Sequence, residues 1–496
     1  MASDYKKIAE EHEKRYGWDT KPRRIYKRLY SEKTHFVDEL IQNADDSGSE
    51  YLKLQLDSNA LLVWNDGRQF NEKDVRSICS LGSSDKDLTD IGTFGIGFKA
   101  VYNYTEFPEI YSRDERFRIR DFIKPESIDE INPEIAELVN RGKTVFCLPF
   151  KDNPHHEDDI ENLKNRLCNL LLKERSLLFL RWLKTFEWKD EPNNQAGSYS
   201  RSRGPFDKIQ NVPENQSVEL VKLTMLLDDN NESSETFLVF CKEVLPPKDV
   251  ISRLLEQAED DEEKQRIQKS ADELQPIEIA FKLQDDRITA MDDNCMVFAY
   301  LPTQKETHLK FLIQARYQTT PPRDNIIHPN ESLWNRWLLE ETAVFLPELL
   351  EHLKASDLLE PAFFNILPLK KDKVPEEFKY IIEALQKAMQ EKAFIPTEKE
   401  RHYAKAEDVF YPDTISLQKL VKSSGMPSDS ELLHPDIRKG TKEFGRCFDI
   451  MDEAGVTEID ENDLLCWLEE RSCEWFKNKT NKWLCSLYIY FNEGVS

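Results

Sequence analysis

The chain has 496 residues, of which 39% are hydrophobic, so it is long enough for roughly three domains with apolar cores. Its 68 Lys plus Arg against 93 Asp plus Glu give a net charge of −25, which disfavours general attraction to nucleic acid or to an anionic membrane. No run approaches the ~18 apolar residues of a membrane span, and the nine cysteines form no CxxC pair, so we expect a soluble, cytoplasmic protein without a zinc site or disulfide framework.

Glycine is scarce, yet its distribution points to one part of the chain. Six of the 15 glycines lie within about fifty residues: Gly48, Gly67, Gly82, Gly92, Gly95 and Gly97. A chain that avoids glycine elsewhere needs it there for positive φ or for close approach to a ligand. We therefore look for function in this stretch. The basic run that precedes it, residues 21–33, is typical of a solvated helix packed on a domain rather than of a nucleic-acid patch.

Residues 34–47 have the pattern of an amphipathic helix. Apolar residues recur at helical spacing: Phe36, Val37, Leu40, Ile41 and Ala44. On another face, Glu39, Asn43 and Asp46 form one polar strip. A carboxylate and an amide stacked in this way can hold a water and a divalent ion side by side, although an ordinary solvated face has the same spacing.

Two strand ends carry further polar residues. The apolar run 61–64 reads as a buried strand that leads into Asn65, Asp66 and Gly67, where a side chain can accept a hydrogen bond from a ligand amine. Downstream, Thr144 opens the strand-like run VFCLPF, and its hydroxyl could bridge to a base or to a bound water.

Between these strands lies a glycine-rich loop. Gly92, Gly95 and Gly97 precede a helical pattern that begins near Phe98, and glycines that open a helix suit a phosphate chain. The polar residues 82–91 have the composition of a lid. Lys86 in that lid and Lys99 after the glycines are weaker candidates for phosphate contact.

Taken together, these motifs resemble the Bergerat-fold (GHKL) ATPase superfamily. LYSEKTHFVDELIQNADD, VWNDGRQF and IGTFGIGFKAVY are most similar to the amino-terminal ATPase module of the sacsin and NO VEIN-like family, over roughly residues 20–190. The resemblance implies a Mg²⁺-dependent ATPase in which Glu39 is the general base, Asn43 ligates Mg²⁺ and Asp46 lines the nucleotide site. It also implies that Thr144 helps to hold adenine. The implied ATP-binding loop residues are Gly92, Phe94, Gly95, Ile96, Gly97 and Phe98.

The sequence departs from the superfamily pattern at the adenine position. Where the superfamily has Asp-x-Gly-x-Gly, this chain has Asn65 two residues before Gly67, with Asp66 adjacent and Gln69 in place of the second glycine. Either Asn65 accepts from the adenine amine or Asp66 replaces it with a shifted turn. Base selectivity is therefore less firmly predicted than triphosphate binding.

The rest of the chain predicts further units. Residues 189–215 are rich in Pro, Asn, Ser and Gly and are expected to form a linker or a mobile loop. We predict an α+β protein with a Bergerat α/β-sandwich ATP-binding domain at 1–190, an α/β transducer-like middle domain at 205–345 and a mostly helical region at 346–496. The aromatic-rich end suggests that the chain continues in a longer protein. In the middle domain, Arg323 in the loop TTPPRDNI is the first candidate to reach the γ-phosphate, and Arg316 is the second.

These features favour an ATPase in which binding of Mg·ATP closes the lid and docks the middle domain, and slow hydrolysis releases it. The resemblance suggests a protein client or partner subunit, or DNA in a maintenance or antiviral defence assembly, and a homodimer is a further expectation. Direct nucleic-acid binding is not favoured by the charge. A nucleotide-gated scaffold without turnover is the alternative, and a histidine kinase is disfavoured because no His-bearing dimerisation helix precedes the module.

Overall fold

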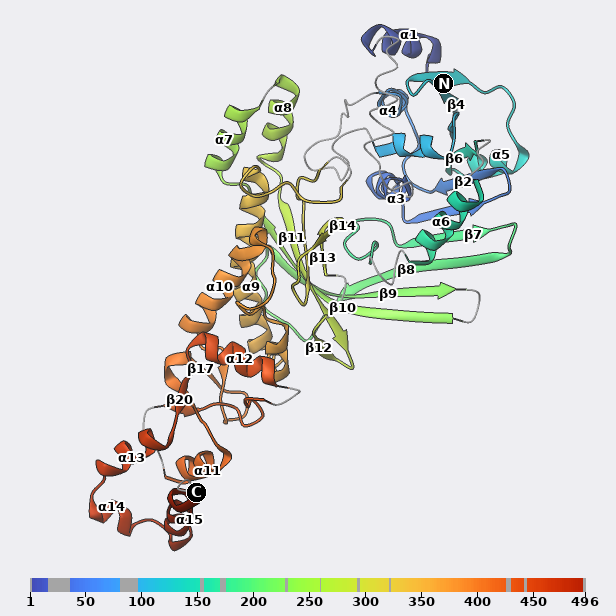
Figure 1. Cartoon of the computed structure of the whole chain (residues 1–496). Helices are drawn as coiled ribbons and strands as arrows, with labels where there is room; N and C mark the ends of the chain where they lie inside the picture. The colour runs from blue at the N-terminus through green and yellow to red at the C-terminus, as the bar shows by residue number, and fades with distance from the viewer. Residues whose placement is uncertain are drawn as a thin grey trace.

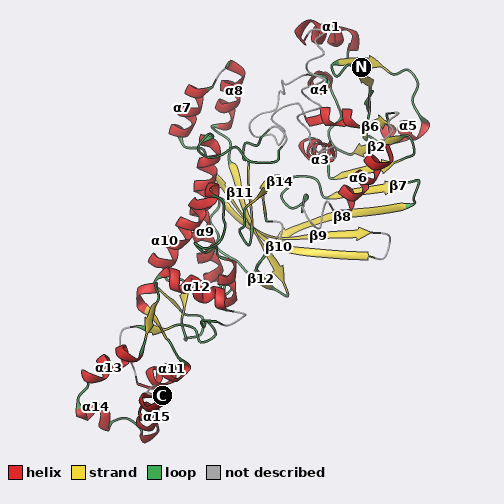
Figure 2. Cartoon of the chain, viewed as in Figure 1, coloured by secondary structure: helices red, strands yellow, loops and turns green. Residues whose placement is uncertain are grey.

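The computed structural model describes residues 2–16, 36–80, 97–151, 156–169, 175–227, 231–258, 260–291, 295–320, 323–424, 430–440 and 444–493. Within these residues, one large mixed sheet crosses the amino-terminal and middle parts of the chain, and helices dominate the carboxy-terminal part (Figures 1 and 2). The architecture is therefore mixed α/β, in agreement with the predicted α+β class.

The elements up to residue 190 surround the predicted nucleotide site. The helices are α1 (Tyr5–Tyr16), α3 (Phe36–Asp46), α4 (Glu72–Ile78), the 3₁₀ helix η2 (Gly97–Asn103), α5 (Pro133–Asn140) and α6 (His156–Asn169). The strands are β1 (Tyr51–Leu56), β2 (Ala60–Asn65), β3 (Glu109–Ser112), β4 (Glu115–Arg120), β5 (Lys124–Ser127), β6 (Thr144–Pro149) and β7 (Thr185–Asp190).

The middle part of the chain extends the sheet. Its strands are β8 (Gln195–Pro205), β9 (Gln216–Leu227), β10 (Asn231–Val244), β11 (Gln275–Gln284), β12 (Arg287–Thr289), β13 (Met296–Ala299), β14 (Leu301–Glu306) and β15 (Leu312–Ala315). Its helices are α7 (Lys248–Gln257) and α8 (Asp261–Ser270). The helix α8 lies within the acidic stretch 256–274.

The strands follow the order β14-β13-β15-β11-β10-β9-β8-β7-β1-β2-β6-β3-β4-β5, with β12 paired to β11. Within this sheet, β1 pairs with β7 and β13 with β15 in parallel, and the other recorded neighbours are antiparallel. The sheet is continuous across residue 190. The predicted division at 190–205 therefore falls inside one sheet, and the domain boundaries stay a prediction.

The prediction that residues 189–215 form a linker or a mobile loop is wrong for residues 195–205. Part of residues 189–215 forms β8, which pairs with both β7 and β9. Its polar composition hides a strand because small and polar residues alternate with buried ones such as Tyr199. Gly197 is needed there, since a Cβ at this position would lie 2.4 Å from Trp188 Nε1.

The chain is mostly helical from residue 333 onward, whereas the prediction placed the mostly helical region at 346–496. The helices are α9 (Leu333–Ala355), η3 (Pro361–Ile366), η4 (Glu376–Phe378), α10 (Lys379–Glu391), η5 (Ala406–Asp408), α11 (Ile415–Ser424), α12 (Gly445–Ala454), α13 (Glu461–Glu469), α14 (Cys473–Lys477) and α15 (Asn481–Glu493). Short strands accompany them: β16 (Ile395–Pro396), β17 (Tyr403–Ala404), β18 (Val409–Pro412), β19 (Glu431–Leu432) and β20 (Thr457–Ile459). None of the helices in the described part of the chain is long and apolar enough to cross a membrane.

Different helices pack on the two faces of the amino-terminal sheet. The apolar stripe of α3 packs on one face with alternate residues of β2 and β6, such as Val63 and Phe146. The intervening residues, such as Trp64 and Val145, face the other way and pack against α5. This alternation assigns each strand residue to the α3 side or to the α5 side.

Candidate functional site

Helix α3 forms as predicted. All five stripe residues are buried, at 0–2% exposure, and the helix ends at Asp46 before Gly48, whose φ is +74°. Glu39, Asn43 and Asp46 are each half-buried on the polar strip. The sequence therefore places a carboxylate and an amide side by side on a helix whose opposite stripe is fixed in the core.

The end of α3 lies directly against the turn after β2. A Cβ on Gly67 would lie 2.0 Å from Ser47 Oγ, and the Arg68 N–H donates to the Ser47 carbonyl at 2.8 Å. Gly67 does not have a positive φ. It is required for the close approach of Ser47, not for a left-handed turn, and this contact brings the Asn65–Gly67 turn next to the polar strip of α3.

A row of buried polar residues crosses three strands at this point. Asn65 on β2 is the register partner of Thr144 on β6, and Thr144 is the register partner of Ser112 on β3. Their exposures are only 5%, 1% and 0%. By alternation all three belong to the α3 face, where their neighbours include apolar residues such as Val63 and Phe146. Buried polar groups beside such residues need hydrogen-bond partners. Because the row lies at the strand ends where the sequence predicts a ligand, we treat it as a candidate binding site.

Hydrogen bonds organise this row. Asn65 Oδ1 accepts from the Gly67 N–H at 3.0 Å. The hydroxyls of Ser112 and Thr144 lie 2.6 Å apart, and Ser112 Oγ accepts from the Phe70 N–H at 2.9 Å. The sequence analysis missed Ser112, because a serine at the end of a short strand carries no local signal of this role.

Asp66, the alternative adenine partner, has a structural task. Its carboxylate accepts from Ser49 Oγ at 2.6 Å and from the N–H groups of Glu50 and Tyr51, both at 3.0 Å. Burial alone raises the pKa of Asp66, but these bonds and the charge of Lys143 outweigh it and hold the pKa below its ordinary value. The carboxylate thereby ties the loop after α3 to the end of β2.

The residues around the glycine loop are partly described. Gly92, Phe94, Gly95 and Ile96 lie outside the described residues, as do Lys86 and the rest of the predicted lid. Gly97 opens η2, which is a 3₁₀ helix rather than the expected longer helical pattern.

Both residues that follow Gly97 point into the protein. Phe98 is buried and packs against Phe146, with ring centroids 5.7 Å apart. The Lys99 amine donates to the carbonyls of Ile78 and Phe122, each at 2.6 Å, and burial lowers its pKa to about 8. The prediction that Lys99 contacts phosphate is therefore wrong, because its amine is held in the core.

A second group of contacts links the end of α3 to the segment just before β7. Asp45, fully buried, accepts from the N–H groups of Arg181, Trp182 and Leu183 at 2.7–3.1 Å. Its neighbour Asp46 pairs with Arg181 Nη2 at 2.6 Å. Sequence reasoning missed Arg181, although a basic residue within the apolar run FLRWL could have drawn attention to it.

The Arg181 guanidinium also packs on the middle part of the chain. It lies 5.2 Å from the ring centroid of Tyr300, and Arg316 lies over the same ring at 5.9 Å. Arg316 Nε donates to the Tyr300 hydroxyl at 2.5 Å. Tyr300 has a φ of +65°, which is strained for an aromatic residue, and it is 3% exposed.

The predicted catalytic Arg323 is held by the backbone just before Tyr300. Its Nη2 donates to the Ala299 carbonyl at 2.8 Å, and its φ is +58°. Of the two candidate arginines, Arg316 therefore contacts the Tyr300 side chain, whereas Arg323 bonds to the carbonyl of the preceding residue.

The residues present fit a magnesium–nucleotide complex. The α3 strip supplies a carboxylate and an amide oxygen, and hard oxygen ligands of this kind, with phosphates and waters, suit Mg²⁺. The buried row supplies hydroxyl and carboxamide groups on an apolar sheet face, as base-binding sites do. We therefore treat the space between α3 and the ends of β2, β6 and β3 as the candidate site.

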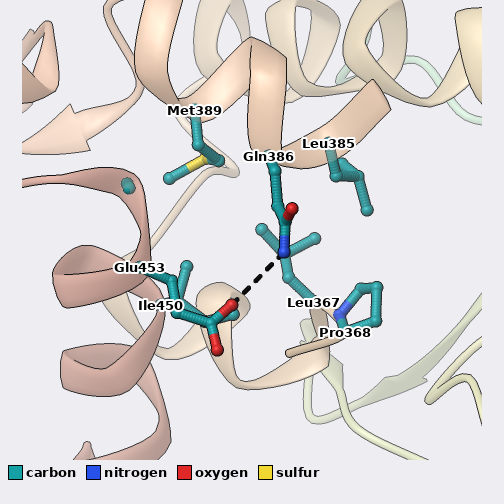
Figure 3. A pocket seen from close by; sticks show the side chains of 8 residues that line it. Leu367, Pro368, Leu385, Gln386, Met389, Ile450 and Glu453 are labelled. Carbon is teal, nitrogen blue, oxygen red and sulfur yellow. Dashed lines mark hydrogen bonds between the residues drawn. The ribbon is translucent and has the colours of Figure 1, made fainter. Parts of the chain in front are cut away.

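A separate pocket lies among the carboxy-terminal helices (Figure 3). Leu385, Gln386 and Met389 of α10 face Ile450 and Glu453 of α12. Its cavity volume is about 20 Å³, which is room for about one water molecule. We assign it no function.

The comparisons with known proteins confirm the sacsin-like resemblance. Residues 23–128 match the model of the Sacsin domain family. The chain is 27% identical over 335 residues to Protein NO VEIN of Arabidopsis thaliana, which covers 64% of this chain and 11% of that protein. It is 33% identical over 108 residues to sacsin of Homo sapiens, which covers 18% of this chain and 2% of sacsin.

The chain therefore corresponds to a small part of each of these curated relatives. Among solved structures, the N-terminal domain of a DNA repair protein matches 41% of this chain and 70% of that chain, with a TM-score of 0.26 and 8% identity. This likeness is too distant to carry an argument.

Proposed function

We propose that this chain, which is sacsin-like over residues 23–128, binds Mg·ATP in a Bergerat-type site, hydrolyses it slowly and passes the nucleotide state to its middle part. The observation that carries the proposal is the polar row of Asn65, Thr144 and Ser112, brought by strand register to the end of the helix that bears Glu39 and Asn43. An ordinary solvated helix face would not have a buried polar row beside it.

The proposal gives each residue a distinct task. Glu39 orients and deprotonates the attacking water, and Asn43 holds Mg²⁺ through its amide oxygen. Bound Mg²⁺ neutralises charge on the phosphate oxygens. Asn65 and Thr144 hold the base, and Asn65 is preferred to Asp66 because the Asp66 carboxylate already accepts three hydrogen bonds.

Coupling to the middle part would run through Asp46 and Arg181. Asp46 continues the strip of Glu39 and Asn43, and its partner Arg181 contacts Tyr300. A shift of α3 on nucleotide binding would therefore act on Tyr300, the residue that follows the Ala299 carbonyl to which Arg323 is bonded. We propose that Arg323 leaves the Ala299 carbonyl to reach the γ-phosphate in the closed state, when residues 82–91 cover the nucleotide.

A second candidate function, a nucleotide-gated scaffold without turnover, has one observation in its favour. Arg323 is held by the Ala299 carbonyl, so hydrolysis requires a rearrangement that binding does not. In either case the client stays a proposal: a protein in chaperone-like work, or DNA in a maintenance or antiviral defence assembly.

Mg²⁺-dependent phosphate release by the purified chain, with nucleotide binding measured in parallel, separates these functions. We expect Glu39→Ala to abolish phosphate release while the affinity for ATP changes little, because the residue acts on the water and not on the nucleotide. Asp38→Ala, one residue away and paired with Arg166 at 2.7 Å, is the matched control and should retain turnover. Unchanged hydrolysis in Glu39→Ala would remove the base assignment.

The same assay tests the docking arginine. Arg323→Ala should lose most phosphate release and keep binding, since the docking arginine acts only in the closed state. A wild-type rate in this variant would exclude the docking step. Binding without turnover in the wild-type chain would favour the scaffold.

A further inference from the structure

The base end of the candidate site has a defined set of hydrogen-bond donors and acceptors. Asn65 is 5% exposed, and its carboxamide orientation is set by Gly67. A backbone N–H can only donate, so the atom that faces Gly67 at 3.0 Å is the oxygen Oδ1. The nitrogen Nδ2 therefore carries two donors, while Oδ1 keeps a second lone pair.

Thr144 adds a hydroxyl beside the carboxamide. Ser112 Oγ accepts from the Phe70 N–H at 2.9 Å, and it lies 2.6 Å from Thr144 Oγ1, where either hydroxyl can be the donor. If Ser112 donates to Thr144, the Thr144 proton is available to a ligand. If Thr144 donates to Ser112, the Thr144 oxygen is available to accept from a ligand. Both directions make the same number of hydrogen bonds in this row, so Thr144 can serve a ligand as donor or as acceptor.

We propose that this site is not restricted to adenine and that it also accepts a 6-oxopurine, a conclusion that rests on the proposed nucleotide binding. A carboxamide can accept from a 6-amino group through Oδ1 or donate to a 6-oxo group through Nδ2. A carboxylate could only accept. The Thr144 proton suits a ring nitrogen acceptor, which both classes of purine have. Asn65 is thus the residue that determines base tolerance.

The test compares ADP with inosine diphosphate, because the two differ only in the 6-substituent and in the protonation of N1. Titration calorimetry on the whole chain with Mg²⁺ should give dissociation constants within about tenfold of each other. Asn65→Asp, of the same shape, removes both donors and should lower the affinity for inosine diphosphate by roughly 5–150-fold relative to that for ADP, the discrimination typical of a good bidentate base contact.

Two further variants isolate the effect. Asp66→Asn makes the reverse exchange, of a carboxylate for a carboxamide, one residue away. It should leave the ratio of the two dissociation constants unchanged, since the Asp66 side chain bonds to residues 49–51. Thr144→Val should lower the affinity for both nucleotides by a similar factor. Here the ratio is the readout, so a general loss of affinity does not imitate the expected result.

A wild-type preference for ADP of more than 100-fold overturns the inference, and it needs no variant to fold. An unchanged ratio in a folded Asn65→Asp variant overturns the assignment to Asn65. If neither diphosphate binds, the proposed nucleotide site fails, and the inference falls with it. Binding of ADP alone leaves the proposed function standing and removes only this inference.

Discussion

The Tyr300 ring should be the point at which α3 and the middle part of the chain are energetically coupled. Arg181 and Arg316 lie over this ring, which is 3% exposed. A cation–π contact shielded from water contributes about 0.5–2 kcal/mol. The hydroxyl accepts from a charged donor, Arg316 Nε, and such a bond contributes about 1.5–3 kcal/mol.

Two substitutions separate these contributions. Tyr300→Leu removes both the ring and the hydroxyl, whereas Tyr300→Phe keeps the ring and removes the hydroxyl alone. Combined with Arg181→Ala, Tyr300→Leu should show a coupling free energy of about 0.5–2 kcal/mol and Tyr300→Phe close to zero. Combined with Arg316→Ala, Tyr300→Phe should show about 1–3 kcal/mol, because the hydroxyl bond is broken.

The assay is a double-mutant cycle on the free energy of unfolding in urea, followed through the transition that unfolds the shared sheet. The effects of substitutions at distant residues on the free energy of unfolding are additive within about 0.3–0.5 kcal/mol, so couplings above this range are measurable. If Tyr300→Phe couples to Arg181 as strongly as Tyr300→Leu does, the ring is not the contact. If Tyr300→Leu does not couple to Arg181, the proposed route from Asp46 to the middle part is refuted.

Two other predictions concern the scaffold of the site. Gly67→Ala places a Cβ 2.0 Å from Ser47 Oγ and 3.0 Å from the Ser47 carbonyl oxygen. It should lower the free energy of unfolding in urea by about 1–3 kcal/mol. Ser47→Gly should relieve part of this loss, and wild-type stability of Gly67→Ala would contradict the contact. Burial lowers the pKa of Lys99 from 10.5 to about 8, so between these values the unfolded chain binds more protons. The stability of wild type relative to Lys99→Met should therefore rise by on the order of 3 kcal/mol from pH 8 to 10.5, and a flat difference would show that the amine is not buried.

Much of the fold near the site could be predicted from local patterns. The helical spacing of Phe36, Val37, Leu40, Ile41 and Ala44 anticipated a helix with a buried stripe, and α3 has it. The apolar runs anticipated β2 and β6 near their observed bounds. These signals are local, because the periods of 3.6 and 2 residues depend only on which face is buried.

Local patterns failed where composition and burial disagreed. β8 was taken for a linker because its Ser, Asn and Gly residues are typical of loops, whereas its pairing with β7 and β9 is a property of the whole sheet. Lys99 is predicted as a weaker candidate for phosphate contact, yet two backbone carbonyls far apart in the sequence hold its amine in the core.

The sequence alone determined which chemical groups this protein has available: a carboxylate and an amide on one strip of a helix, and polar residues at the ends of two strands. Only the tertiary structure decided how they meet. Strand register placed Ser112 against Thr144, the close approach of Ser47 to Gly67 brought the strand end to α3, and three hydrogen bonds committed Asp66 to its loop. Such contacts depend on pairing and packing between distant segments, which periodicity along the chain does not encode.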